Sequence, residues 1–119
     1  HEDHIGALPY LLREARVPVY GTALTLALVV EKLREHGLAE TADLRPLRPR
    51  VPFEVGPFRV EPIRVTHSIA DGIGLAVDTP VGTIVHTGDF KLDPSPLDGE
   101  APDYRKFAEL GEQGVLLLC

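Results

Sequence analysis

The arrangement of apolar positions predicts two helices in the first third of the chain. Over residues 6–16, Leu and Ala recur at helical spacing, and Pro9 falls in the first turn, where its missing N–H costs little. A longer helix is expected from Thr22, a suitable N-cap, to His36, with Gly37 as the residue that stops it. The apolar face of this longer helix consists of Leu26, Val29, Val30 and Leu33.

Prolines and short apolar runs predict strands in the remainder of the chain. Prolines at five positions between 46 and 62 exclude a helix there. Residues 51–55 and 58–61 flank Gly56-Pro57 and predict a β-hairpin. The other expected elements are short strands over residues 17–20, 63–65, 72–78 and 83–86, a helix over 104–110 and a buried strand over 115–118. Because strands and helices alternate, the fold class is α/β.

Composition narrows the class of protein further. With 119 residues, of which 44% are hydrophobic and 25% charged, the chain has the composition of at most one globular domain. It begins at His1 and contains no Met, so we expect a segment of a longer chain. The single Cys119 excludes an internal disulfide and favours a reducing compartment. No apolar run reaches the ~18 residues of a membrane span.

Charge is unevenly distributed. The formal net charge of −6 argues against a large basic surface for nucleic acid. Residues 45–64 differ, because they carry five arginines and only two acids. Two interpretations stay open: a solvated loop and hairpin, which we favour, or an edge that faces phosphate. The arginines are Arg45, Arg48, Arg50, Arg59 and Arg64.

Five residues are candidates for binding a metal. His1, Asp3 and His4 lie within four residues, immediately before the first expected helix. His67 and Asp89 each follow an expected strand, and loops at one end of a sheet commonly contribute ligands to one site. Imidazole suits zinc and related transition metals, and carboxylate adds a harder oxygen ligand.

Each candidate also has an ordinary structural interpretation. The first four residues fit a solvated terminus with acids near a helix N-terminus. His67 fits a hydrogen-bonded histidine of the core, and Asp89, after a glycine, fits a turn. His36 fits a cation at a helix C-terminus, and His86 a packed or supporting residue within a strand, so neither is counted as a ligand.

Three stretches resemble a known family. Residues 1–10, HEDHIGALPY, resemble the second half of the His-x-His-x-Asp-His motif of the metallo-β-lactamase superfamily, in the form that ribonuclease J uses. Residues 65–69, VTHSI, and 82–94, GTIVHTGDFKLDP, also match. The last stretch is the most specific, because small-molecule hydrolases of the superfamily rarely continue Gly-Asp into Phe-Lys-Leu-Asp-Pro. The sequence is therefore similar to the ribonuclease J family, within the β-CASP group.

The resemblance implies a fold and a ligand set. The fold would be a partial αββα sandwich, with residues 1–119 forming part of one metallo-β-lactamase-like domain. His1 and His67 would serve a first zinc ion, Asp3 and His4 a second, and Asp89 would bridge both. The motif's first His, the final ligand His and the β-CASP insertion are not among these residues, so the isolated chain is expected to be inactive.

The resemblance also implies an activity. The whole protein would hydrolyse RNA phosphodiesters, as a 5′-to-3′ exonuclease with endonuclease activity, in RNA processing and decay. Two zinc or manganese ions would activate a water, Asp3 would accept its proton, and the +4 charge would offset the acidic chain. The enzyme would be cytoplasmic and form dimers or tetramers. The alternatives are a hydrolase of small esters, thioesters or lactones on the same fold, and a non-catalytic binding segment.

Overall fold

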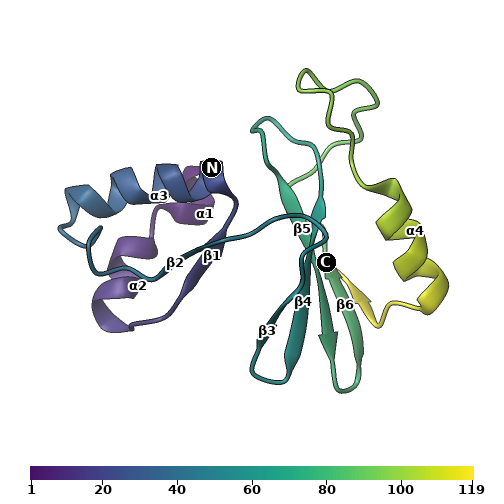
Figure 1. Cartoon of the computed structure of the whole chain (residues 1–119), viewed down its shortest axis with the longest axis horizontal. Coiled ribbons are helices and arrows are strands. Elements are labelled where there is room, and N and C mark those ends of the chain that lie inside the picture. The colour runs from purple at the N-terminus through teal and green to yellow at the C-terminus, as the bar shows by residue number, and fades with distance from the viewer. The chain divides into compact units, whose positions relative to one another are not determined.

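The chain forms two compact units, His1–Leu47 and Arg48–Cys119, which are described in turn (Figure 1). The structure is a computed structural model that describes all 119 residues. None of its helices combines the length and the apolar character that crossing a membrane requires.

The first unit contains three helices and a pair of parallel strands. The strand β1 (Val19–Gly21) pairs with β2 (Leu44–Pro46), and α3 (Ala23–Glu35) is the crossover between them. Two shorter helices precede this β–α–β arrangement: α1 (Glu2–Ile5) and α2 (Leu8–Glu14).

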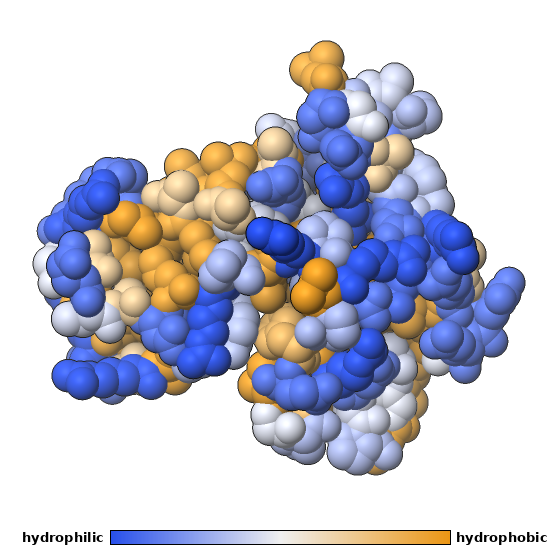
Figure 2. Space-filling model, viewed as in Figure 1, coloured by the Kyte–Doolittle hydropathy of each residue, from blue (hydrophilic) through white to orange (hydrophobic).

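The prediction for α3 is confirmed. Thr22 is its N-cap residue, in an extended backbone conformation, and Gly37 follows the helix with a positive φ of 69°. The buried side chains are Leu26, Val29 and Leu33 of the expected apolar face, whereas Val30 is only half-buried. Apolar side chains are also exposed on this helix, and Figure 2 shows apolar surface over it; they include Leu24 and Leu28, one turn apart.

The second unit is a five-stranded sheet with one helix, α4 (Tyr104–Gln113). The strands, in spatial order, are β3 (Phe53–Val55), β4 (Phe58–Arg64), β5 (Ile73–Thr79), β6 (Gly82–His86) and β7 (Leu117–Leu118). The first four pair antiparallel, and β7 pairs parallel with β6. The hairpin expected at Gly56-Pro57 is confirmed, since Val55 pairs with Phe58. The strands expected over 72–78 and 83–86 form a second hairpin, in which Thr79 pairs with Gly82.

The core of this unit lies between the sheet and α4. Ile63, Ala76 and Val85 come from three neighbouring strands and form a buried cluster with Leu110 of α4. Phe107 and Val115 pack against this cluster. Asp103 caps α4, because its carboxylate accepts a hydrogen bond from the backbone N–H of Lys106 at 3.0 Å.

Two predictions need correction, and two elements were not expected. The expected buried strand over 115–118 is wrong: β7 has two residues, and Leu117 and Leu118 are 51% and 68% exposed. The buried cluster under α4 is formed by β4, β5 and β6, and from the last segment of the chain only Val115 packs against it. The last helix continues beyond residue 110, to Gln113. The helical turn α1 and the strand β2 were not expected at all.

Candidate metal site

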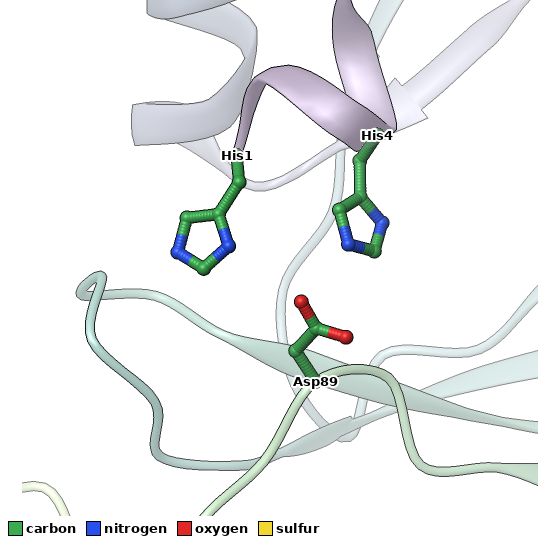
Figure 3. Close-up of side chains that lie close together, drawn as sticks. All are labelled: His1, His4 and Asp89. Carbon is green, nitrogen blue, oxygen red and sulfur yellow. The ribbon is translucent and has the colours of Figure 1, made fainter.

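Three of the five candidate ligands lie on the single turn of α1. His1 is the N-cap residue of this turn and His4 follows three positions later, so both side chains project from one side of it (Figure 3). Their ring centroids are 6.3 Å apart, and the rings are inclined at 67°. Asp3 lies beside them, with Oδ2 3.7 Å from Nε2 of His4. The three residues therefore form one exposed cluster of imidazole and carboxylate donors.

An ion pair holds this turn to the next long helix. Lys32 of α3 donates a hydrogen bond of 2.6 Å to Oε1 of Glu2, and this bond raises the pKa of Lys32 above its ordinary value. Gly6 ends the turn, with its N–H donating to the carbonyl oxygen of Glu2 at 2.7 Å. A Cβ at position 6 would lie 2.7 Å from that same oxygen, so glycine permits the close approach.

The other two candidates meet at one edge of the five-stranded sheet. His67 follows β4 and Asp89 follows β6, and both strands pair antiparallel with β5. The strands β4 and β6 therefore run in the same direction and end at the same edge. Nε2 of His67 lies 3.8 Å from Oδ2 of Asp89, and the two side chains are 28% and 45% exposed. Asp89 itself lies on the loop after β6 (Figure 3).

Two glycines bring this loop close to β5. Gly88 has a φ of +63°, and a Cβ at this position would lie 2.6 Å from the carbonyl oxygen of Ile73. A Cβ at Gly74 would lie 2.8 Å from the carbonyl oxygen of His86. Both contacts are shorter than real Cβ atoms show, so only glycine lets the chain pass here and deliver Asp89 to the edge of the sheet.

His86 supports the same turn. Its Nδ1 accepts a hydrogen bond of 3.0 Å from the backbone N–H of Gly88, one residue before Asp89. The expectation that His86 is a supporting residue agrees with this contact, although its side chain is exposed rather than packed. Sequence reasoning missed Gly74 and Gly88, since a glycine in a strand and another after a strand carry no signal for a close backbone contact.

Backbone and side-chain bonds join the segments that carry His67 and Asp89. Thr66, which is 8% exposed, forms an isolated antiparallel bridge with Lys91. The N–H of Lys91 donates to the carbonyl oxygen of Thr66, and Oγ1 of Thr66 donates to the carbonyl oxygen of Lys91, both at 2.7 Å. The residue before His67 is thereby fixed to the segment that follows Asp89.

The arginines of residues 45–64 are mostly paired with acids. Arg45 donates to both carboxylate oxygens of Asp43 and lowers the pKa of that carboxyl. Three others have ion pairs within 3.5 Å: Arg50 with Asp103 and Glu109, Arg59 with Asp78 and Glu61, and Arg64 with Glu100. This pairing favours the solvated loop and hairpin over a phosphate-facing edge, since paired acids neutralise the positive charge.

The donor chemistry of the candidates fits zinc. Imidazole nitrogens and carboxylate oxygens are both established zinc ligands. The α1 cluster offers two imidazoles and a carboxylate, and the sheet edge offers one of each. This composition, with no thiolate, is typical of catalytic rather than structural zinc sites.

Comparison with curated proteins identifies the relatives of the chain. Ribonuclease J of Helicobacter pylori (strain ATCC 700392 / 26695) is 49% identical over 119 residues, which cover 99% of this chain and 17% of the relative. Ribonuclease J of Thermus thermophilus is 50% identical over 125 residues, covering 99% of this chain and 22% of the relative. Over nearly its whole length, the chain is similar to ribonuclease J. The resemblance drawn from the three motifs is confirmed, and the chain spans about a fifth of the length of these ribonucleases J.

Solved structures support the fold of the chain. A protein of unknown function from Enterococcus faecalis V583 matches with a TM-score of 0.54 and 25% identity, over 64% of this chain and 20% of that chain. The metallo-beta-lactamase fold protein YhfI from Bacillus subtilis matches with a TM-score of 0.50 and 19% identity, over 75% and 36%. The predicted α/β class and partial metallo-β-lactamase sandwich are thus confirmed. The sequence matches no protein-family model.

Proposed function

We propose that the protein carrying this chain is a metal-dependent ribonuclease that hydrolyses RNA phosphodiester bonds. It acts as a 5′-to-3′ exonuclease and also as an endonuclease, in RNA processing and decay. The observation that carries this proposal is the identity of about one half with curated ribonucleases J, over 99% of the chain. Hydrolysis of small esters, thioesters or lactones is the alternative on the same fold. The extension of Gly88-Asp89 into Phe-Lys-Leu-Asp-Pro argues against it.

The proposed metal ligands are the five candidates. His1 and His67 would hold a first ion, Asp3 and His4 would hold a second, and Asp89 would be a ligand shared by both. Two features support this assignment: the match of residues 1–10, 65–69 and 82–94 to the family motifs, and the 3.8 Å separation of His67 from Asp89. The ions are zinc, with manganese as the alternative, because imidazole and carboxylate donors accommodate both.

The protein's own groups bind and orient the substrate and move one proton. When bound, the ions activate a water and offset charge on the phosphate oxygens. Asp3 would accept the proton that an attacking water loses as its oxygen bonds to phosphorus, and the departing ribose oxygen would take up a proton from solvent. Its side chain is 74% exposed, so it is open to water and substrate. His67 and Asp89 are held in place by the Thr66–Lys91 bridge and by the Gly88 turn.

The setting of the enzyme is part of the proposal. The full-length protein binds RNA, forms a dimer or tetramer and works in the cytoplasm, a reducing compartment that suits the single Cys119. The 119-residue chain alone is proposed to bind metal weakly and not to turn over, because the motif's first His and the final ligand His are not among its residues. Tight binding of two zinc ions by this chain would contradict that expectation.

One assay separates the proposed function from its alternative. The full-length protein is incubated with zinc or manganese and offered a 5′-monophosphate RNA and, separately, a thioester. We expect release of nucleotides from the RNA and no thioester hydrolysis. Cleavage of the thioester without the RNA would refute the ribonuclease, and no reaction with either would favour a non-catalytic binding segment. The same protein stripped by a chelator is the control and should be inactive.

A further inference from the structure

The second unit contains a cavity of about 290 Å³ next to the candidate ligands His67 and Asp89. It lies between the segment that follows β4 and the loop that leads from β6 to α4. His67 itself lines the cavity, and its Nε2 is the atom that lies 3.8 Å from Asp89. Whatever occupies the cavity is therefore a direct neighbour of the proposed reaction centre. Its polar lining includes Arg64, Ser68, Lys91, Asp93 and Asp98.

Size and charge define what the cavity accepts. Its volume is at the lower end of the ~300–1,000 Å³ typical of small-molecule sites, which suits one nucleotide rather than a protein segment. The lining mixes cations and carboxylates instead of carrying one sign of charge. Arg64 is occupied by Glu100, at 3.3 Å. A ligand with both an anionic group and hydroxyl donors matches such a lining.

Lys91 is the cation best placed to meet a phosphate. Its backbone is fixed by the two bonds to Thr66, while its side chain is 55% exposed. The ammonium lies 3.4 Å from Oδ2 of Asp93, longer than the ~2.7–2.9 Å of a charge-assisted hydrogen bond. An ammonium has three donors, so a phosphate oxygen can be bound without displacing a strong internal partner.

The carboxylates of Asp93 and Asp98, on the same loop as Lys91, are held by backbone N–H groups of that loop. Oδ1 of Asp93 accepts from the backbone N–H of Ser95 at 3.1 Å, and Oδ1 of Asp98 accepts from that of Glu100 at 3.0 Å. A carboxylate accepts up to four hydrogen bonds, so both groups retain capacity for hydroxyl donors. The wall is thus formed before any ligand arrives.

We propose that this cavity is a subsite for the nucleotide next to the scissile phosphate. Lys91 binds the phosphate of that nucleotide, and Asp93 or Asp98 accepts a hydrogen bond from its 2′-hydroxyl. The inference rests on the proposed ribonuclease function and deepens it, since it assigns residues that position the RNA without taking part in the chemistry. Lys91 is therefore a binding residue, and its removal affects affinity rather than the chemical step.

The test measures RNA binding and cleavage on the same samples of the full-length protein. A labelled single-stranded RNA is titrated by fluorescence anisotropy at several KCl concentrations, with wild type, Lys91→Gln, Lys91→Arg and Ala70→Trp. The matched control is Arg105→Gln, which removes an 86% exposed cation of α4 that pairs with Glu109. Far-ultraviolet circular dichroism checks that each variant is folded.

The expected results separate the effect of the Lys91 charge from the effect of filling the cavity. Lys91→Gln should weaken binding ~10-fold, as for one lost charge-assisted hydrogen bond. The slope of log affinity against log salt should fall by about 0.7, the value for one phosphate contact on a single strand. Lys91→Arg should retain the slope. Ala70→Trp, at the cavity wall, should weaken binding with an unchanged slope, and Arg105→Gln should match wild type.

Failure of the inference and failure of the proposed function give different results. If wild type cleaves RNA and Lys91→Gln behaves like Arg105→Gln, the subsite is refuted while the ribonuclease stands. If wild type binds RNA with the expected Lys91 dependence but does not cleave it, the cavity is an RNA-binding site without cleavage, and the ribonuclease fails. If wild type neither binds nor cleaves RNA, both are overturned.

Discussion

Nε2 of His67 lies 3.8 Å from Oδ2 of Asp89, although the two residues follow different strands that are not neighbours in the sheet. The strand β5 separates β4 from β6, and the segments beyond them converge past its end through the Thr66–Lys91 bridge. An imidazole and a carboxylate thus share one edge of the sheet, held there by backbone geometry.

Asp89→Ala in the full-length protein is expected to abolish RNA cleavage and leave the fold largely intact. Asp89 is a proposed metal bridge, and even residues that only support metal ligands cost ~10–100-fold when mutated, so kcat should fall by at least about 100-fold. The measurements are cleavage rate, zinc content and thermal unfolding. Asp78→Ala is the control, because Asp78 has a similar exposure, 43% against 45%, and pairs with Arg59 on the sheet. Retained activity would remove Asp89 from the metal site.

Gly88→Ala is expected to destabilise the protein and displace Asp89. The new Cβ would meet the carbonyl oxygen of Ile73 at 2.6 Å while the backbone keeps a φ of +63°. Gly56→Ala is the matched control, since Gly56 has a φ of +57° and nothing within 4 Å of an added Cβ.

Comparison of the two glycine variants separates the backbone strain of a positive φ from the close contact of an added Cβ with Ile73. Gly56→Ala should lower the free energy of unfolding by ~1 kcal/mol, from the left-handed conformation alone. Gly88→Ala should lower it by about 3 kcal/mol and also reduce zinc affinity. Chemical denaturation and metal titration supply the two values. Equal losses of unfolding free energy for both variants would show that the close contact with Ile73 adds nothing to the effect of the left-handed backbone.

Local signals explain which elements could be predicted from the sequence. The helix α3 was predictable because its N-cap residue Thr22, its apolar face and Gly37 all point to one element. The hairpin turn at Gly56 was predictable because Gly56-Pro57 lies between two short runs of strand-forming residues. The strand β2 was not, because three residues show no periodicity and it forms only through pairing with β1, distant in sequence. The helical turn α1 is similarly short, and the ion pair from Glu2 to Lys32 contributes to holding it.

The candidate site was partly predictable in the same way. His67 and Asp89 were identified because each follows an expected strand, and the structure places them together. Gly74, Gly88 and His86 support Asp89 through backbone distances and a single hydrogen bond. Such relationships depend on the three-dimensional path of the chain, so residue type and spacing do not disclose them.

Lys106→Met should destabilise the second unit, because it removes the ion-pair partner of the buried carboxylate of Glu61. Nζ of Lys106 lies 2.9 Å from Oε2 of Glu61, and the side chains are only 14% and 9% exposed. Without Lys106, the nearest cation to Glu61 is Arg59, at 3.5 Å. Breaking a buried ion pair such as Glu61–Lys106 by removing one partner costs ~3 kcal/mol. The double variant Glu61→Leu/Lys106→Met should recover most of this loss, as measured by chemical denaturation. A double variant no more stable than Lys106→Met would contradict the desolvation argument.

Arg50→Met should destabilise the protein at neutral pH but much less in acid. Arg50 donates to both carboxylate oxygens of Asp103, at 2.6 and 2.9 Å, and this pairing holds the pKa of Asp103 below its ordinary value. A lowered pKa stabilises the fold above the unfolded value of ~3.9, and that contribution is lost as the pH falls through the folded value.

Arg50→Met is therefore expected to lower the free energy of unfolding by ~1–2 kcal/mol at pH 7. The loss is no larger because Arg50 is 40% exposed and solvent screens its ion pair. The loss should shrink steadily below about pH 4. Free energies of unfolding of wild type and variant at pH 7, 5 and 3 provide the difference, in which acid effects common to both proteins cancel. Arg105→Gln is the control, since its exposed i,i+4 pair with Glu109 is worth less than ~0.5 kcal/mol at every pH. A difference for Arg50→Met that stays constant from pH 7 to 3 would show that packing, and not the charge of Asp103, accounts for its effect.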